Sequence, residues 1–163
     1  MAGRGPDDQQ VQVTLVTEDD PVVARLVGEL QEEYVERYGG ADATPVAAGE
    51  FAPPTGAFLV LFVGDEPAGC GALRRHDAAE VEVKRLFVRR PFRGRGLSRR
   101  LMTELERTAV ELGYRRILVE TGLAQPEAIA LYESSGYHRV PGFGHYRDRP
   151  QNRCYAKDFK NAF

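Results

Sequence analysis

Twelve residues, Arg89–Arg100, hold six arginines around Gly94 and Gly96. A guanidinium keeps its charge and binds carboxylates and phosphates through two parallel N–H donors. Glycine has no side chain, so its backbone N–H can approach the oxygens of an anion closely. The segment therefore predicts a site for an anionic ligand, and a surface loop that caps a helix is the alternative.

The charge of the whole chain is uneven along the sequence. The net charge is only -2, yet residues 1–83 carry 16 acidic and 5 basic residues, whereas residues 84–163 carry 8 acidic and 17 basic ones. The basic half suits an anion, and the acidic half suits a cation such as an amine. Two solvated faces of opposite sign are the other interpretation.

The elements that must position this segment follow from hydrophobic periodicity and from turn residues. Strands are predicted over residues 11–17, 57–63, 68–76, 80–88, 115–121 and 152–159. Helices are predicted from about Pro21 to Tyr38, from Leu97 to Gly113 and over residues 126–136. Residues 41–56 are predicted to be a loop with a short helix. This order indicates an α+β fold with a mixed sheet and helices on its faces.

Length and composition limit the class of protein. At 163 residues with 42% hydrophobic residues, the chain predicts one domain over residues 11–163 after a disordered tail at residues 1–10. No apolar run is long enough for a membrane span, and the first residues do not resemble a signal peptide. Two cysteines and three scattered histidines provide neither a disulfide framework nor zinc-ligand spacing. We therefore expect a cytoplasmic protein with reduced thiols and no metal.

The arginine and glycine segment joins the end of a predicted strand at Val88 to the start of a predicted helix at Leu97. A helix N-terminus presents free N–H groups and the positive end of the dipole, which favours phosphate. A nucleoside-triphosphate P-loop requires a lysine after the last glycine, and a dinucleotide loop requires a third glycine where Arg99 stands. Neither of these phosphate motifs is present.

The segment "RGRGLS", Arg93–Ser98, resembles the acyl-CoA loop of the GNAT superfamily of N-acyltransferases. "EVKRLFVRRPFRGRGLSRRLM" is similar to the strand, loop and helix of that family, and "QPEAIALYESSGY" is similar to a later helical segment. The resemblance implies the GNAT fold, with antiparallel strands followed by a parallel pair that splays apart, and acetyl-CoA as acyl donor. Ser98 and Gln125 depart from the residues usual in the family.

The resemblance also implies which residues hold the cofactor. The pantetheine would lie along one strand, and the pyrophosphate would lie on the N–H groups of the loop. The residues expected to bind it are Leu86, Phe87, Val88, Arg93, Gly94, Arg95, Gly96, Leu97, Ser98 and Gln125.

Two catalytic residues follow from the same resemblance. Tyr132 matches the tyrosine that protonates the leaving thiolate, and a packing tyrosine is the alternative. Glu82 matches a glutamate that acts as general base, and an exposed strand residue facing Lys84 is the alternative. An amine can also lose its proton to solvent, so no dedicated base is required. Cys70 has no histidine to activate it and is expected in the core, and His145 is a candidate for the acceptor pocket.

The predicted function is acetyl transfer from acetyl-CoA to a primary amine, by a monomer or a homodimer. A non-catalytic acyl-CoA-binding domain is the main alternative. Nucleic-acid binding through Arg89–Arg100, with Phe92 as a stacking residue, is a weaker one, because the pI is about 6.0 and the basic segment is short. The acceptor is expected between residues 29–48 and 140–152, which carry no recognisable motif.

Overall fold

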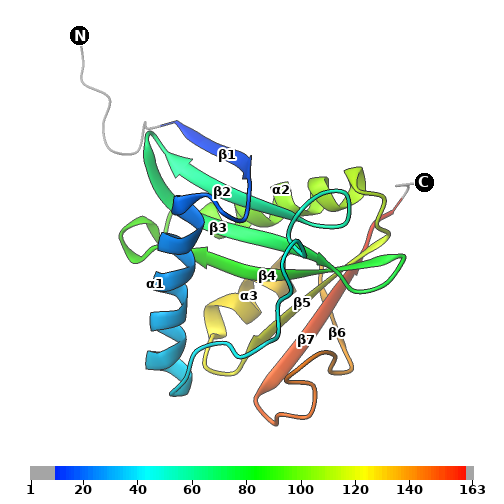
Figure 1. The fold of residues 1–163 in the computed structure, drawn as a ribbon. Helices are drawn as coiled ribbons and strands as arrows, with labels where there is room; N and C mark the ends of the chain where they lie inside the picture. The colour runs from blue at the N-terminus through cyan, green and yellow to red at the C-terminus, as the bar shows by residue number, and fades with distance from the viewer. Residues whose placement is uncertain (1–9, 161–163) are drawn as a thin grey trace.

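A seven-stranded mixed sheet forms the centre of the molecule, in the order β1-β2-β3-β4-β5-β7-β6 (Figure 1). The structure is a computed structural model that describes residues 10–160. Its strands are β1 Val11–Val16, β2 Ala57–Val63, β3 Glu66–Arg75, β4 Glu80–Val88, β5 Arg116–Gly122, β6 His138–Val140 and β7 Asn152–Asp158. Its helices are α1 Pro21–Tyr38, the 3-10 turn η2 Arg90–Phe92, α2 Leu97–Glu111 and α3 Pro126–Ser134.

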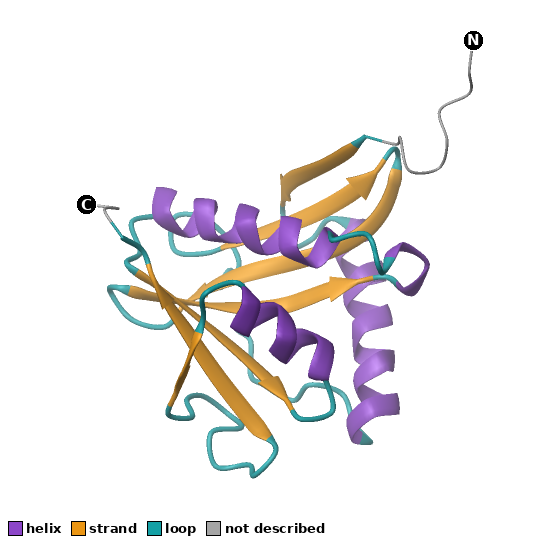
Figure 2. Ribbon diagram, turned by 180° about the vertical axis from the view of Figure 1, so that it is seen from behind, coloured by secondary structure: helices purple, strands orange, loops and turns teal. Residues whose placement is uncertain are grey.

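Helix α1 lies on one face of the sheet, and α2 and α3 lie on the other, as Figure 2 shows from behind. Helix α1 begins where the carboxylate of Asp20 accepts a hydrogen bond from the N–H of Val22 at 3.0 Å. It ends at Gly39, which has a φ of 79° and donates its N–H to the carbonyl of Val35. Local capping residues therefore fix both ends of the helix.

Helix α2 packs closely on the sheet because small residues face it. The apolar residues on one side of this helix are buried, with Leu101 and Leu105 fully inaccessible. A Cβ added to Gly71 of β3 would lie 2.7 Å from a methyl carbon of Leu105. The glycine in this strand thus sets the distance between α2 and the sheet, and α2 carries the arginine and glycine loop at its N-terminus.

The sheet opens between β4 and β5. These parallel strands pair only over Glu80–Glu82 and Arg116–Leu118, although both continue further. Strand β5 pairs with β7 along its whole length, whereas β4 pairs with β3. Arg85 has a φ of 60°, and the β3–β4 register shifts beside it, so β4 carries a bulge where the strands separate. The diverging strands leave backbone groups of β4 available to an extended ligand.

The structure confirms the predicted fold class and corrects some details. Strand β3 begins two residues earlier than predicted, and the short strand β6 was not predicted. The short helix expected in residues 41–56 is wrong, because this segment forms turns only. Its prolines lack the N–H that a helix needs. The tail expected at residues 1–10 lies outside the described residues, except for Gln10.

Candidate active site

The loop before α2 presents its backbone to open space. Gly94 and Gly96 have φ values of 80° and 75°, a region that residues with a Cβ rarely adopt. A Cβ built on either glycine would meet no atom within 4 Å. Gly96 is the N-cap of α2 and no side chain caps the helix, so first-turn N–H groups remain available to an anion. This arrangement fits the phosphate groups of a nucleotide cofactor.

A cleft of about 390 Å³ extends from this loop into the opening between β4 and β5. Its lining includes every predicted cofactor residue except Arg95, namely Leu86, Phe87, Val88, Arg93, Gly94, Gly96, Leu97, Ser98 and Gln125. Arg95 instead places its guanidinium over the ring of Phe92, 5.7 Å from the centroid. The fold therefore brings nine of the ten expected cofactor residues to one cleft.

The acidic face of α1 pairs with the arginines that precede α2. Arg93 contacts both oxygens of Glu33, at 2.8 and 2.9 Å, and Arg89 contacts Glu29 at 2.8 Å. Arg90 pairs with Glu36. The acidic and basic parts of the chain thus neutralise each other across this junction, which weakens the interpretation of either as a separate surface for a cation or for nucleic acid.

Glu33 stands inside the cleft with an incompletely satisfied carboxylate. Burial acts to raise its pKa, but the hydrogen bond and charge of Arg93, with the charges of Arg37 and Arg90, lower it overall. One of its oxygens, Oε1, is buried without a hydrogen bond of acceptable geometry. Glu33 therefore remains ionised at neutral pH beside the loop that suits an anion.

Tyr132 lies on α3 and faces the cleft. Its side chain is buried against Tyr137 and Tyr155, at ring distances of 5.6 and 6.0 Å. Its hydroxyl makes no hydrogen bond with any residue between 10 and 160. Burial raises the pKa of this phenol, so it stays protonated. Tyr132 thus packs in the core and also presents a free proton donor to the cleft.

The structure does not bring Glu82 to the cleft. Glu82 lies directly opposite Arg74 in the antiparallel β3–β4 pair, and its carboxylate accepts a hydrogen bond from the guanidinium of that residue, with which it forms an ion pair. Arg74 also contacts Glu50 at 3.1 Å. Glu82 is 6% exposed and lines neither of the two cavities described around the β4–β5 opening. Its surroundings are those of a structural ion pair.

A second cavity of about 520 Å³ adjoins the cleft on the side of β7. It is bounded by the C-terminal end of α1 with the residues after it, and by the segment between β6 and β7. Both belong to the regions expected from the sequence to hold the acceptor. His145 does not line it and packs on Tyr146. The two cavities share six lining residues, which are Tyr34, Asp42, Lys84, Glu120, Thr121 and Gln125.

Glu120 of β5 is the residue of this junction that sequence reasoning missed. Its Oε1 lies 3.9 Å from the ammonium of Lys84, and its Oε2 accepts a hydrogen bond from Asn152 at 3.4 Å. Burial raises its pKa and Glu82 and Asp42 add to the increase, against the opposing charge of Lys84. A raised pKa suits a group that exchanges protons near neutral pH. The only local signal was a charged residue inside the apolar run "ILVET".

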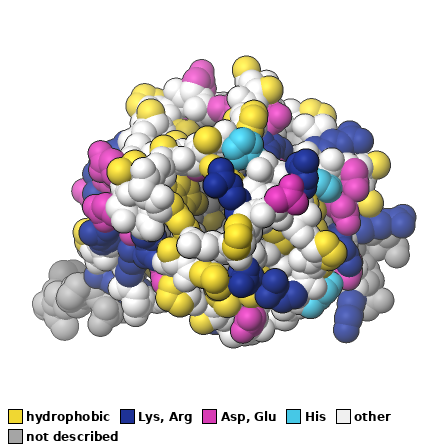
Figure 3. Space-filling view, turned by 90° about the horizontal axis from the view of Figure 1, so that it is seen from below, with side chains coloured by type: hydrophobic (Ala, Val, Ile, Leu, Met, Phe, Trp, Pro, Cys, Tyr) yellow, Lys and Arg dark blue, Asp and Glu magenta, His cyan; other side chains and the backbone are white. Residues whose placement is uncertain are grey.

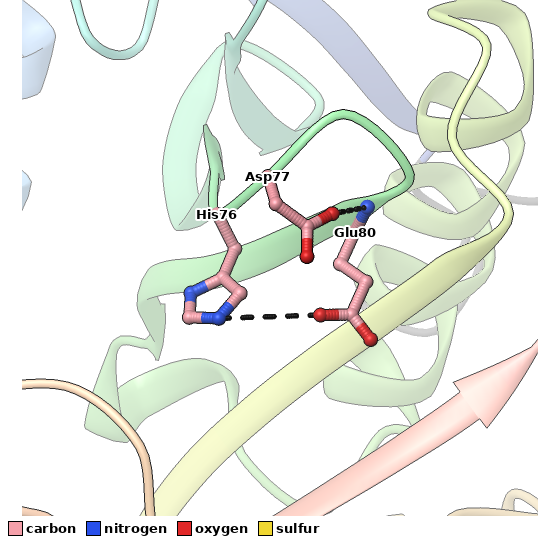
Figure 4. Close-up of side chains that lie close together, drawn as sticks. All are labelled: His76, Asp77 and Glu80. Atoms are coloured by element: carbon pink, nitrogen blue, oxygen red, sulfur yellow. Dashed lines mark hydrogen bonds and ion pairs between the residues drawn. The ribbon is translucent and has the colours of Figure 1, made fainter.

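The structure also gathers three potential metal ligands far from the cleft. His76, Asp77 and Glu80 lie at the turn between β3 and β4, with donor atoms within 4.8 Å of one another (Figure 4). Asp77 accepts the N–H groups of Ala79 and Glu80, and thereby holds the turn. A search for histidine and cysteine spacing could not reveal this mixed cluster, which lies at the opposite end of β4 from the loop before α2.

Comparison with known proteins decides the family. The model of the acetyltransferase (GNAT) family matches residues 23–137. The chain belongs to the GNAT family. It is 33% identical over 129 residues to the IAA acetyltransferase of Azospirillum brasilense, a match that covers 78% of this chain and 84% of that protein.

Solved structures of the GNAT family share the fold. An acyl-CoA N-acyltransferase structure from Klebsiella pneumoniae has a TM-score of 0.77 at 26% identity, covering 91% of this chain and 97% of the other. A GNAT acetyltransferase from Elizabethkingia anophelis with acetyl-CoA bound has a TM-score of 0.66 at 15% identity, covering 91% and 98%. These matches confirm the predicted fold, and the family identifies the chain as an acyltransferase enzyme. Within residues 10–160, no helix has the length and apolar character needed to span a membrane.

Proposed function

We propose that this GNAT enzyme transfers the acetyl group of acetyl-CoA to a primary amine by direct attack. The observation that carries the proposal is that two cavities, one suited to a cofactor and one to an acceptor, meet at six shared residues. A nucleophile in one cavity can therefore reach an acyl group held in the other. A homodimer, a cytoplasmic location and a single domain over residues 11–163 stay predictions.

The cleft fits acetyl-CoA by its backbone rather than by its side chains. The open space at Gly94 and Gly96 and the uncapped start of α2 suit the pyrophosphate. The stretch of β4 at Leu86–Val88 pairs with β3 but not with β5, and its free edge suits the amide groups of the pantetheine arm. When bound, the cofactor supplies an acetyl thioester, which an amine attacks with loss of the CoA thiolate.

Glu120 is the base that the geometry favours, in place of Glu82. Glu120 lies at the junction of the two cavities, whereas Glu82 is paired with Arg74 outside them. The Glu120 carboxylate can take a proton from the acceptor ammonium, directly or through a water molecule. Its raised pKa makes it a better proton acceptor than an ordinary glutamate.

Two tyrosine hydroxyls that line the cleft provide proton donors. Tyr132 faces the cleft from α3 and is our candidate for the acid that protonates the departing thiolate. Tyr34 faces both cavities from α1, makes no hydrogen bond through its hydroxyl with any described residue, and has a pKa raised by burial. We assign Tyr34 to hydrogen bonding with the acyl oxygen as negative charge develops on it.

A thiol-release assay with acetyl-CoA tests the proposal. A panel of amino acids, polyamines, aminoglycosides and simple amines should contain acceptors that release CoA faster than the rate without amine. Mass spectrometry should find a product heavier by one acetyl group. If acetyl-CoA binds, as judged by a thermal shift, and no amine in the panel accelerates thiol release, the non-catalytic acyl-CoA-binding alternative is supported.

A further inference from the structure

We propose that the acceptor is an α-amino acid with an apolar side chain, whose amine lies at Glu120 and whose carboxylate lies at Arg149. The inference rests on the proposed function and specifies the substrate class of the second cavity. It follows from which charged groups around that cavity are already paired and which are available.

The cavity offers one carboxylate to an ammonium group. Asp42 accepts hydrogen bonds from both the N–H and the hydroxyl of Thr44, at 2.9 and 2.6 Å, and lies within 4 Å of Lys84 and Arg85. Its pKa is lowered overall, because these partners outweigh the effect of burial. Glu120 is different, because among residues 10–160 its Oε1 has one ion-pair partner, the ammonium of Lys84 at 3.9 Å. A single ammonium can therefore be matched here, and a second one cannot.

The cavity also offers one cation to an anionic group. Lys84 is committed between Asp42 and Glu120, and it lies 3.4 Å from the hydroxyl of Thr44. Arg149 lines the same cavity, and its guanidinium has no ion pair or hydrogen bond with any residue from 10 to 160. An unpaired arginine at the wall of a substrate cavity is well suited to a carboxylate, which accepts two of its N–H donors.

The backbone of Arg149 is held in place. Its N–H donates to the carbonyl of Tyr146 and its carbonyl accepts from the N–H of Asn152, both at 3.0 Å. The hydroxyl of Tyr146 in turn accepts the N–H of Ala43 at 2.7 Å, which joins this segment to the residues that follow α1. The arginine is thus presented from a segment that is tied across the cavity.

Part of the remaining wall is aromatic. Tyr34, Tyr38 and Tyr146 line the cavity, whose volume of about 520 Å³ is within the range of small-molecule sites. Figure 3 views this end of the molecule, where a recess containing hydrophobic atoms opens beside a basic side chain. Aromatic walls suit an apolar side chain between the two charged ends of an amino acid.

A polyamine fits this arrangement poorly. Its second ammonium would meet Lys84 or Arg149 without a free carboxylate. The acidic face of α1 does not supply one, because Glu29, Glu33 and Glu36 are paired with arginines beside the loop. The acidic half of the sequence therefore does not predict a cationic acceptor.

The test compares each amino acid with the amine that lacks only its carboxylate. Steady-state kcat/KM is measured for L-phenylalanine against phenethylamine and for L-leucine against 3-methylbutylamine. The parent enzyme should prefer the amino acid by at least about 10-fold. Arg149→Ala should lower kcat/KM for the amino acids by about 10- to 100-fold and should change that for the amines less than about threefold.

Arg147→Ala is the matched control. Arg147 lies on the same segment, is exposed, contacts Asp148 at 3.8 Å and lines neither cavity. Arg147→Ala should leave the preference for the amino acid over its matched amine unchanged in both substrate pairs. Arg147→Ala and Arg149→Ala should both keep the thermal shift given by acetyl-CoA. Equal use of amino acids and matched amines by the parent, or equal loss on both substrates in Arg149→Ala, would overturn the inference while leaving the proposed function intact. Absence of turnover with every amine would overturn both.

Discussion

The cleft proposed for the cofactor and the cavity proposed for the acceptor lie side by side, but they are assembled from the chain in different ways. The cofactor side is largely one continuous run, from Leu86 on β4 through the loop to Ser98 on α2. The acceptor side collects residues from the end of α1, from β4 and β5 and from the segment before β7. A binding surface made of neighbours in sequence can be recognised from a motif, whereas one assembled from distant segments requires the tertiary structure.

The two sides also differ in how they handle charge. The cofactor side holds arginines against the acidic face of α1, and the groups that we expect to bind the phosphates are backbone N–H donors. The acceptor side keeps Glu120 and Arg149 incompletely paired beside fully paired neighbours. We infer that affinity for the cofactor depends mainly on the backbone, whereas the choice of acceptor depends on a few side chains that are not fully paired.

The largest expected effect is on kcat/KM, and it distinguishes Glu120 of β5 from Glu82 of the adjacent strand β4. Glu120→Gln should lower kcat/KM by about 100-fold or more near neutral pH, with partial recovery at high pH, where more of the amine is already neutral. In the parent, kcat/KM should rise with pH through a limb that lies above the usual glutamate range, since the pKa of Glu120 is raised. Steady-state pH profiles provide the measurement.

Glu82→Gln is the matched variant and should keep most of the activity. It breaks the ion pair with Arg74, so its main effect should be a lower melting temperature. A large loss of kcat in Glu82→Gln, together with a parent-like Glu120→Gln, would return the base to Glu82.

The second effect concerns the hydroxyl of Tyr132. Tyr132→Phe keeps the ring and its contacts with Tyr137 and Tyr155, so stability and acetyl-CoA affinity should change little. Loss of the acid should lower kcat by about 100-fold. Tyr34→Phe removes the other free hydroxyl and should cost about 10-fold or more in kcat. If Tyr132→Phe turns over at the parent rate while chemistry limits kcat, Tyr132 has only a packing role.

A smaller effect tests the phosphate loop by calorimetry and thermal unfolding. Acetyl-CoA at about 100 times its Kd should stabilise the parent by roughly 2.7 kcal/mol. Gly96→Val places a side chain in the open space next to the α2 N-terminus and should remove most of that gain. Gly113→Val controls for backbone strain, because Gly113 also has a positive φ and open surroundings but lies beyond the far end of α2. Equal binding by both variants would contradict the assignment of the loop.

The smallest effect is expected at Glu33, where stability and affinity should change in opposite directions. Glu33→Gln removes a partner of Arg93 and should destabilise the protein by about 1.5–3 kcal/mol at pH 7. It also removes a negative charge from the cofactor cleft, so acetyl-CoA should bind several-fold more tightly. Weaker binding in this variant would show that Glu33 supports the loop more than it opposes the anion.

The pH dependence of unfolding distinguishes Glu33 from Glu120. The pKa of Glu33 is lowered on folding, so its stabilisation is present above the unfolded pKa and is lost as the pH falls. The pKa of Glu120 is raised, so the native state keeps its proton longer and loses stability as the pH rises through that range. Glu120→Gln should therefore maintain or raise the melting temperature at neutral pH, and Glu33→Gln should lower it.

The sequence was sufficient for the fold, and the cofactor residues that it predicts stand in one largely contiguous run that lines the cleft. Periodicity located most strands and the three α-helices, and the loop between Val88 and Leu97 was identified because its residues are contiguous. The general base could not be predicted in the same way. Sequence position alone could not show that Glu82 faces Arg74, since that depends on the register of the β3–β4 hairpin.

The surroundings of Glu120 also could not be predicted from the sequence. Its neighbours Lys84 and Asn152 are separated from it by more than thirty residues of sequence, and they meet only because β5 lies between β4 and β7. Arg149 is one of many arginines in the basic half of the chain, and only the structure shows that its guanidinium lines a cavity and has no ion pair with a residue from 10 to 160. Pairing of charges is a property of the fold and has no local signal.

The central claim is that both substrates occupy the joined cavities at once and react directly. Initial rates of thiol release, measured over a grid of acetyl-CoA and acceptor concentrations, test it most directly. Burial raises the pKa of Cys70 to about 12 and also raises that of Cys154, so neither thiol is an activated nucleophile. We predict double-reciprocal lines that intersect and no burst of CoA without acceptor. Parallel lines with a stoichiometric burst of CoA would show a covalent acetyl-enzyme and would contradict the account.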